Sequence, residues 1–380
     1  MTNEYKTKSL IEFLEHMKDK HVPEKEQWQN AVRFLEFKAR EKLVPLHGHF
    51  ELTPFCNLNC KMCYIHLNGD QFDKFQLLTV DTWKKLINQA HSKGMIFATL
   101  TGGECLMYPQ FEELYLYLWE LGIKTGILTN GVLLTESQIN FFKHYPPYHI
   151  QVSLYGSSDN AYEKVTGKRV FGTVKMNLEH LRDAHLPLDI AITPNRFMAD
   201  DVIPILELVE ALDIPYNINS QLISPRKNTG RETEDFSTEQ YIEIFKERRR
   251  LSNIEVMPLG TVELPDENHE GTAVYGLKCG AGRSNFVIRY DGKMSPCVSM
   301  DELTVDTLKL GFCEAWKQIN SMAKEYPLPV ECADCAYHNQ CSSCAVIHKN
   351  APNPGHCDPR ICERTKAFIR AGLYPLPKKK

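Results

Sequence analysis

Three cysteines stand close together early in the chain, in the run Thr-Pro-Phe-Cys-Asn-Leu-Asn-Cys-Lys-Met-Cys-Tyr. Cys56, Cys60 and Cys63 have the spacing C-x3-C-x2-C. Three thiolates on one loop can bind three irons of a cubic [4Fe–4S] cluster, which leaves the fourth iron open to another molecule. The alternatives are a redox thiol pair or a zinc site, which normally takes four protein ligands and has His66 as its nearest further candidate.

The cysteine loop resembles that of the radical S-adenosylmethionine (SAM) superfamily. The resemblance implies that the open iron binds the amino and carboxylate groups of SAM. It also implies that SAM is cleaved reductively to methionine and a 5′-deoxyadenosyl radical, which abstracts hydrogen from the substrate. In such enzymes the cofactors carry the difficult chemistry and the protein orients them. Tyr64, directly after Cys63, joins the expected cofactor contacts.

A second motif, Thr-Gly-Gly-Glu, ends at Glu104 and follows a predicted strand. Glycines let backbone approach a ligand closely, and a carboxylate can pair with an ammonium group. By resemblance, Gly102, Gly103 and Glu104 contact the amino group of SAM. The family usually has proline next, whereas this chain has Cys105, which we interpret as a small buried residue rather than a catalytic one.

Further candidate SAM contacts follow later strands. Thr129 and Asn130 begin a Thr-Asn-Gly segment that is alternatively a simple turn, and Ser153 lies near the end of the next predicted strand. Hydroxyl and amide groups can hydrogen-bond ribose or carboxylate oxygens. By resemblance, Lys168 or the arginine after it reaches the SAM carboxylate, with a solvated charge pair as the alternative, and Ile192 contacts adenine.

Short apolar runs alternate with helical patterns through the first two thirds of the chain, which predicts repeated βα units and a parallel sheet. The predicted strands are His49 to Leu52, Phe97 to Leu100, Lys124 to Leu128, His149 to Leu154, Leu188 to Ile192 and Tyr216 to Leu222. Six such units fit the α/β fold of the radical SAM family, a partial (β/α)6 TIM-like barrel. In parallel barrels the loops at the carboxyl ends of the strands build the active site.

Most of the remaining cysteines lie in the C-terminal third, which has little apolar sequence for a core of its own and which metal clusters would stabilise. Asp291-Gly292 predicts a hairpin turn there. The pattern C-x12-G-x4-C, gap, C-x2-C-x5-C resembles the SPASM extension of radical SAM enzymes. Cys344 departs from it, because it follows Cys341 after two residues instead of three.

The SPASM resemblance implies two auxiliary [4Fe–4S] clusters, and therefore three clusters with the SAM-binding one. We assign Cys279, Cys297 and Cys344 to the first auxiliary cluster, with Cys357 or Cys313 as its fourth ligand. The second receives Cys332, Cys335, Cys341 and Cys362. The alternative is one or two zinc ribbons, because C-x2-C knuckles also bind zinc.

Composition is that of a globular protein with room for a large domain and a smaller one. The chain has 380 residues, 43% of them hydrophobic, and a net charge of -4, which gives no reason to expect nucleic acid. No apolar run approaches the roughly 20 residues of a membrane span. Thirteen cysteines favour metal ligands in a reducing cytoplasm over disulfides.

The expected domain organisation follows from these patterns. Two amphipathic helices, Ser9 to Lys20 and Glu24 to Lys42, form an N-terminal cap. The predicted parts are the cap over 1–45, the barrel over 46–225, a helical linker over 226–275, the SPASM domain over 276–370 and a basic tail over 371–380.

The expected function is that of a radical SAM/SPASM enzyme. It would act on a ribosomally made precursor peptide, installing a crosslink or another modification, with a flavodoxin- or ferredoxin-type electron donor. Sulfatase-maturing relatives carry an aspartate base where this chain has Val298, which disfavours oxidation to formylglycine. The alternatives are a radical SAM oxidoreductase for a small molecule or cofactor biosynthesis, and a non-catalytic metal-binding module, which would not need Glu104 and Ser153.

Overall fold

A nine-stranded, mostly parallel sheet organises the chain, in the strand order β6-β5-β4-β3-β2-β1-β7-β8-β9. The computed structural model describes residues 24–65, 76–220, 236–252, 276–277, 279–329 and 355–374, with single positions 9, 12, 13, 15, 331, 335, 337, 340, 341, 344–346 and 353. The strands β1 to β7 pair in parallel, and β8 and β9 are antiparallel to their neighbours.

The six predicted strands are confirmed as the core of the sheet, with small changes at their ends. They are β1 His47–Glu51, β2 Phe97–Thr101, β3 Lys124–Thr129, β4 His149–Leu154, β5 Leu188–Ile192 and β6 Tyr216–Ile218. The predicted end of the sixth strand, 221–222, lies outside the described residues.

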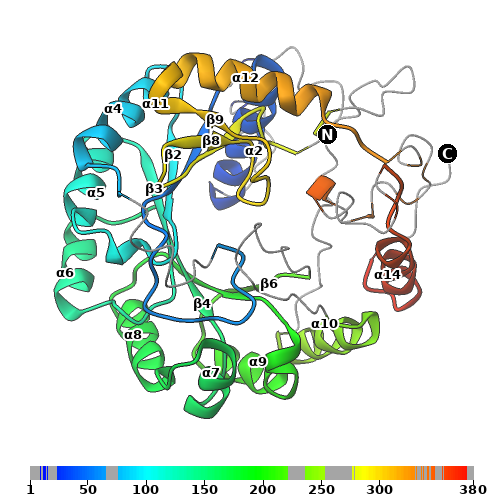
Figure 1. Cartoon of the computed structure of the whole chain (residues 1–380). Coiled ribbons are helices and arrows are strands. Elements are labelled where there is room, and N and C mark those ends of the chain that lie inside the picture. The colour runs from blue at the N-terminus through cyan, green and yellow to red at the C-terminus, as the bar shows by residue number, and fades with distance from the viewer. Residues whose placement is uncertain are drawn as a thin grey trace.

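Helices cover the outer face of this sheet in a ring, as Figure 1 shows. They are α4 Val80–His91, α5 Phe111–Glu120, α6 Glu136–His144, α7 Asp159–Thr166, α8 Phe171–Asp183 and α9 Val202–Ala211, with the short 3-10 turns η2 Cys105–Met107 and η3 Arg196–Asp201. Among the described residues no helix is long and apolar enough to cross a lipid bilayer.

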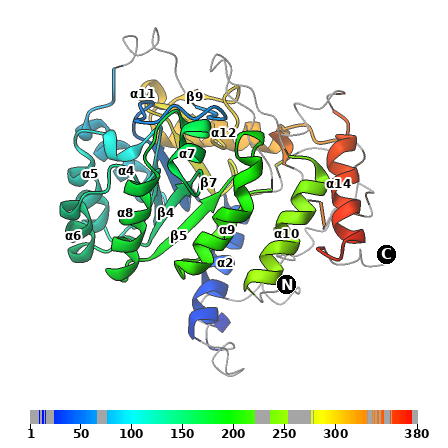
Figure 2. The same cartoon turned by 90° about the horizontal axis from the view of Figure 1, so that it is seen from below.

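The predicted second N-terminal helix is present as α2 Glu24–Lys42. Its residue Ala39 packs with Leu46 and Phe97, which stand at the starts of β1 and β2. The helix therefore lies at the end of the barrel where the strands begin (Figure 2). The predicted first helix falls mostly outside the described residues.

Strand alternation separates an apolar outer face from a polar inner one, because successive side chains of a strand point to opposite sides. Phe50 of β1 points outward, where its ring meets Trp83 of α4 and Phe286 of the next strand at centroid distances of 5.9 and 6.0 Å. His49 and Glu51 therefore face inward. The inner face of the barrel is consequently rich in hydrogen-bonding groups.

The first part of the predicted SPASM region shares the barrel core instead of lacking one. The strands are β7 Asn285–Ile288, β8 Lys293–Ser295 and β9 Val305–Asp306, followed by α11 Thr307–Leu310 and α12 Phe312–Glu325. The β7–β8 hairpin turns at Gly292, whose φ of 76° suits glycine. Phe286 is fully buried and stacks edge-on against Phe312 and Trp316 of α12. Parallel pairing of β7 with β1 covers an otherwise open sheet edge.

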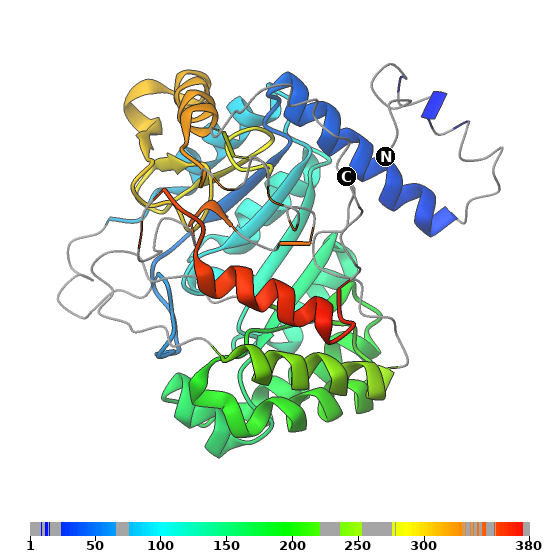
Figure 3. The same ribbon diagram turned by 90° about the vertical axis from the view of Figure 1, so that its right-hand side faces the viewer.

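Two more helices lie on the open side of the partial barrel, between β6 and β9. They are α10 Thr238–Ser252, within the predicted linker, and α14 Pro359–Arg370. Figure 3 looks at this side and shows α14 crossing it beside α10. The Arg364 guanidinium donates to the carbonyls of Ser220 and Phe236 and lies over the ring of Tyr241, so α14 is fixed against the sixth unit.

Candidate active site

The cysteine loop follows β1 and is docked onto the end of α7. Cys60 is buried, and Cys56 and Cys63 are half-buried. The backbone N–H groups of Asn59 and Lys61, on either side of Cys60, donate to the carbonyls of Thr166 and Val165, both at 2.9 Å. Those carbonyls belong to the last turn of α7 and have no partner within the helix. The loop is therefore held by a helix end of the barrel itself.

The three thiols lie near the phenol of Tyr155. The pKa of Cys56 is raised to about 11, mainly by burial, with the nearby Glu104 and Cys63 contributing to the rise. Burial also raises the pKa of Tyr155, and the charges of Cys60, Cys63 and Cys56 all add to that rise. Without a bound cation the Cys56 thiol would remain protonated, whereas metal binding requires and stabilises the thiolate.

Cys56, Cys60 and Cys63 supply the number and kind of donors that a cubic cluster requires. Such a cluster spreads three thiolates over three irons, so the thiolates need not meet at a single ion. Among the described residues, no three His, Cys, Asp or Glu side chains are grouped to hold one metal ion. The loop therefore fits a [4Fe–4S] cluster, and the His66 of the zinc alternative lies outside the described residues.

The Gly-Gly-Glu segment lies against the strand that precedes the cysteines. Gly103 N–H donates to the Thr53 carbonyl at 2.7 Å, and Glu104 N–H donates to the Phe55 carbonyl at 2.8 Å. A Cβ on Gly103 would lie 2.2 Å from the Phe55 oxygen, and Gly102 has a φ of 145°. The close approach of the Thr53–Phe55 backbone therefore requires both glycines, even without a bound ligand.

The carboxylate of Glu104 is buried and bonded by the chain itself. It accepts from the Thr129 hydroxyl at 2.8 Å, from the Asn130 N–H at 2.7 Å and from the Leu106 N–H at 3.2 Å. Burial raises its pKa, and these donors oppose the rise. The sequence assigned Glu104 and Thr129 to SAM, but here their side chains bond each other and join the ends of β2 and β3.

Asn130 reaches from the third strand end to the cysteine loop. Its Nδ2 lies 2.7 Å from Asn57 Oδ1 and 3.6 Å from Cys56 Sγ, and its Oδ1 accepts from the Val132 N–H at 3.0 Å. Cys105, which directly follows Glu104 in the sequence, is fully buried. Its thiol donates to the Leu128 carbonyl at 3.2 Å. These contacts agree with Cys105 as a small buried residue.

The other expected cofactor contacts, Ser153, Tyr64 and Ile192, lie in different surroundings from one another. Ser153 is half-buried on the inner face of β4, where its hydroxyl lowers the pKa of Tyr155, and Tyr64 is half-buried at the end of the loop. Ile192 is fully buried in the core with the outward side chains. The structure therefore does not bring the Ile192 side chain to the inner face.

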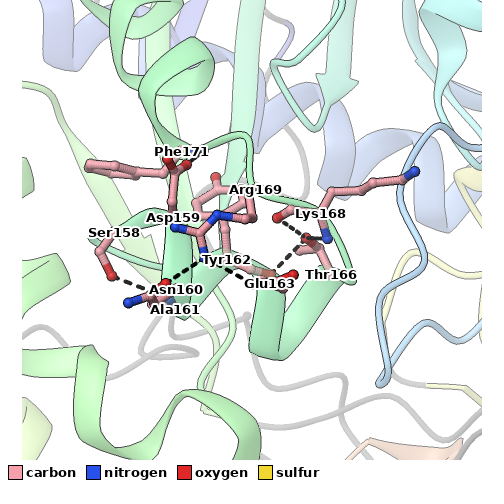
Figure 4. A network of polar contacts seen from close by, with 10 residues as sticks. All are labelled: Ser158, Asp159, Asn160, Ala161, Tyr162, Glu163, Thr166, Lys168, Arg169 and Phe171. Carbon is pink, nitrogen blue, oxygen red and sulfur yellow. Dashed lines mark hydrogen bonds and ion pairs between the residues drawn. The ribbon is translucent and has the colours of Figure 1, made fainter.

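The Thr-Gly-Lys-Arg run follows α7, whose N-cap is Ser158 and whose C-cap is Gly167 at a φ of 72°. Arg169 pairs with Asn160 and Glu163 at the surface, so this arginine forms the solvated pair (Figure 4). Lys168 is exposed, and its side chain extends away from that network.

The cysteines assigned to the first auxiliary cluster come together. The pKa of Cys297 is raised to about 11, mainly by burial, with the nearby Cys344 and Cys279 contributing to the rise. Close by, the Gly276 and Leu277 N–H groups donate to carbonyls in and just after the last turn of α12. The three thiols therefore gather at the C-terminal end of α12.

Cys313 lies apart from this group. It is exposed in the first turn of α12, and about ten residues of helix at 1.5 Å each separate it from Ala323 in the last turn. Of the other candidates, Cys332 lies outside the described residues, Cys335, Cys341 and Cys357 are half-buried, and Cys362 lies in the first turn of α14.

Residues 50–209 match the family model described as the radical SAM superfamily. That span contains the cysteine loop, the Gly-Gly-Glu segment and the strands up to β5. This chain carries a radical SAM domain. The expected radical SAM core is confirmed, and the cysteines from which we expect a SPASM extension follow it in the chain.

Curated relatives of this radical SAM enzyme are distant in sequence. Sporulation killing factor maturation protein SkfB of Bacillus subtilis (strain 168) is 24% identical over 300 residues, which is 78% of this chain and 69% of that protein. AdoMet-dependent heme synthase of Methanosarcina barkeri (strain Fusaro / DSM 804) is 24% identical over 317 residues, 78% of this chain and 89% of that protein.

Among solved structures, Streptococcus suis SuiB bound to S-adenosylmethionine has a TM-score of 0.64 at 16% identity, over 89% of this chain and 82% of that one. SuiB bound to its precursor peptide SuiA gives a TM-score of 0.63. At this identity the likeness concerns the fold, which is the radical SAM partial barrel.

Several residues of this radical SAM site carried no recognisable sequence signal. Asn57 pairs with Asn130, while Val165 and Thr166 receive the loop backbone. Only contacts between segments distant in sequence reveal them. One sequence pattern does indicate the docking site of the loop: Ser158 and Gly167 are typical caps of a helix after the fourth strand, and that helix is α7.

Proposed function

We propose that this radical SAM enzyme modifies a ribosomally synthesised precursor peptide, installing a crosslink or another post-translational change. The observation that carries the proposal is the double likeness to a named peptide maturation protein and to a fold solved with its precursor peptide. Both likenesses extend over more than three quarters of the chain.

The proposed cofactor contacts divide between side chains that face the pocket and those that support it. SAM bound to the cluster would supply the 5′-deoxyadenosyl radical that abstracts hydrogen from the substrate. Cys56, Cys60 and Cys63 would hold the cluster. Ser153 is the side chain best placed on the inner face to bond SAM. We assign Glu104 and Thr129 the role of fixing the loop whose backbone meets the cofactor.

The inner face of β4 to β6 supports a substrate with many hydrogen-bonding groups. Register pairs Gln151 with Asp189 and Ala191 with Asn217 across this face. Asp189 accepts from Gln151 at 3.0 Å and from Asn217 at 2.9 Å, and it also bonds His149. Peptide backbone offers a donor and an acceptor at every residue, which such a lining can satisfy.

A second candidate is a small-molecule substrate of the tetrapyrrole class. The likeness to AdoMet-dependent heme synthase, of which 89% is covered, favours it. A tetrapyrrole would present a broad apolar surface to the barrel. The polar inner face of β4 to β6 therefore argues for the peptide over this candidate.

Reaction assays that compare substrates test the proposal. The dithionite-reduced, cluster-loaded enzyme would be incubated with SAM and either a precursor peptide encoded beside its gene or an iron porphyrin precursor. We expect 5′-deoxyadenosine to increase with the peptide and the mass of that peptide to change. Stimulation by the porphyrin alone, with its conversion, would overturn the peptide assignment.

We also propose two auxiliary [4Fe–4S] clusters, with Cys357 as the fourth ligand of the first. The proximity of Cys279, Cys297 and Cys344 supports this allocation, and the position of Cys313 at the other end of α12 argues against its use. Iron content should fall in Cys344→Ala and stay at the wild-type value in the matched Cys313→Ala variant. Equal loss in both variants would contradict the allocation.

The remaining proposals concern the cellular setting. A flavodoxin- or ferredoxin-type protein would supply the electron, and we place the reaction in the cytoplasm, where thiols stay reduced. Reduction of the enzyme by such a donor in place of dithionite tests this assignment. An enzyme active with dithionite but inert with both donor types would contradict it.

A further inference from the structure

The cysteine loop is contacted by polar groups that act on sulfur rather than on substrate. Cys56 Sγ receives the Leu58 N–H at 3.4 Å and lies 3.6 Å from Asn130 Nδ2. Both hydrogens of that amide are directed into the loop, because its other partner is Asn57 Oδ1 at 2.7 Å. The orientation is fixed by the Val132 N–H, which bonds Asn130 Oδ1. One thiol therefore has a side-chain donor held in place.

A second polar group, the hydroxyl of Tyr162, is buried near the Tyr155 N–H, which can donate to its oxygen, but its own proton has no acceptor among the described residues. Tyr162 is fully buried on α7. Leaving such a group unpaired costs about 1–3 kcal/mol, so a buried orphan donor calls for a partner. Unlike the tyrosines at 108 and 115, whose hydroxyls bond backbone carbonyls at 2.8 Å, this one has no acceptor from the barrel.

Docking of the loop brings Cys60 to the side of α7 that carries Tyr162. The residues on either side of Cys60 bond the carbonyls of Val165 and Thr166. Positions three and four residues apart lie on one face of a helix, so Tyr162 shares a face of α7 with Val165 and Thr166. The charge of the Cys60 thiol is close enough to raise the pKa of the Tyr162 phenol, as burial also does.

We infer that Asn130 and Tyr162 are positioning residues that donate hydrogen bonds to the thiolates of Cys56 and Cys60 when these hold the cluster. A donor to a cluster sulfur stabilises the reduced form, which carries one more negative charge. Hydrogen bonds to sulfur are among the factors that set iron–sulfur reduction potentials. The two residues would raise the potential and so make the cluster easier to reduce. This inference depends on the cluster but not on the substrate.

Tyr162→Phe tests the inference, because it removes one oxygen and leaves the ring in place. The readout is the midpoint potential of the SAM-responsive cluster signal in anaerobic redox titration, followed by electron paramagnetic resonance. We expect the equilibrium constant for one-electron reduction to fall about tenfold, which is 59 mV. Tyr115→Phe is the matched control, since it removes a buried hydroxyl on α5 and should leave the potential unchanged.

Asn130→Leu supplies an independent second variant with the same expected direction. The thermal midpoint of metal-free Tyr162→Phe should stay close to that of the wild type, because the proton of the removed hydroxyl has no acceptor there. A potential for cluster-loaded Tyr162→Phe that matches the wild type would overturn the inference for that residue. Failure to find a peptide substrate would leave these potentials unchanged, so it tests the proposed function alone.

Discussion

At the scale of single residues, the site depends on one buried carboxylate as much as on its cysteines. Glu104 joins the Gly-Gly-Glu segment to the third strand end through two hydrogen bonds, from Thr129 and Asn130, and accepts a third from Leu106. Asn130 in turn bonds the cysteine loop. The three motifs that the sequence shows separately are therefore one network, and Glu104 is its centre.

Replacement of this carboxylate is expected to destabilise the protein before any cofactor binds. Glu104→Gln should lower the free energy of unfolding by about 1–3 kcal/mol, because an amide turns a donor toward N–H or O–H groups that need acceptors. Chemical denaturation of the metal-free protein measures this change. Glu113→Gln, an exposed carboxylate on α5, is the control and should change it by less than about 0.5 kcal/mol. Equal stability of the two variants would contradict the proposed network.

The sequence predicted the chemical groups of the site better than their partners. Cysteine spacing located the cluster loop, and the pair of glycines marked a close backbone approach that Thr53 and Phe55 explain. The sequence could not show that the Glu104 carboxylate accepts a hydrogen bond from Thr129, because that contact forms only when the ends of β2 and β3 meet. Ile192 was assigned to adenine from its position at a strand end, but strand alternation turns its side chain to the core.

At the scale of elements, β1 carries two histidines on its inner face that burial keeps neutral. The rings of His47 and His49 stack at a centroid distance of 4.5 Å, and His47 Nε2 lies 2.8 Å from Thr99 Oγ1. Burial is the main cause that lowers the pKa of His47 to about 3, with His49 adding to it, and burial lowers the pKa of His49 to about 4. Both rings retain some exposure to solvent.

These histidines should make the fold sensitive to mild acid. The unfolded chain takes up protons near 6.5 while the folded chain does not, so stability is present above pH 6.5 and falls toward about 4 and 3. Between about pH 7.5 and about pH 5.5, above most carboxyl titration, the thermal midpoint of the wild type should fall more than that of His47→Gln/His49→Gln. An equal fall in both proteins would contradict this role.

The elements themselves were predictable to the extent that their contacts are local. Short apolar runs between helical patterns predicted the six strands, and Asp291-Gly292 predicted the β7–β8 hairpin. The pairing of β7 with β1 joins residues more than two hundred positions apart, so no local pattern indicates it. For the same reason no local pattern indicates that α12 packs on the barrel.

At the scale of the whole molecule, the barrel and the start of the cysteine-rich region share a core. The Trp316 indole donates to the Leu43 carbonyl, and the Phe312 N–H donates to Gln89 of α4, so α12 is bonded to both ends of the first βα unit. Phe286 lies at the centre of this contact, between Phe50 and the aromatic rings of α12. The auxiliary cysteines at the end of α12 are thereby connected rigidly to the barrel.

Truncation of that central ring should destabilise the barrel as well as the extension. Phe286→Ala is expected to cost about 3–5 kcal/mol and to move a single unfolding transition to lower denaturant, because both regions lose packing. Tryptophan fluorescence and far-ultraviolet circular dichroism should report the same midpoint. Leu310→Ala, at an exposed site on α11, should leave it unchanged. A second, separate transition in Phe286→Ala would show that the two regions fold independently.

The measurement that tests the central claim most directly is 5′-deoxyadenosine formed from SAM by the anaerobically reconstituted, dithionite-reduced enzyme. The matched protein is the triple variant Cys56→Ala, Cys60→Ala, Cys63→Ala, whose loop stays docked on α7 through backbone bonds and should therefore fold. The account predicts product from the wild type and none from the variant. Cleavage of SAM at the same rate by both proteins would contradict the assignment of the cluster to these three cysteines.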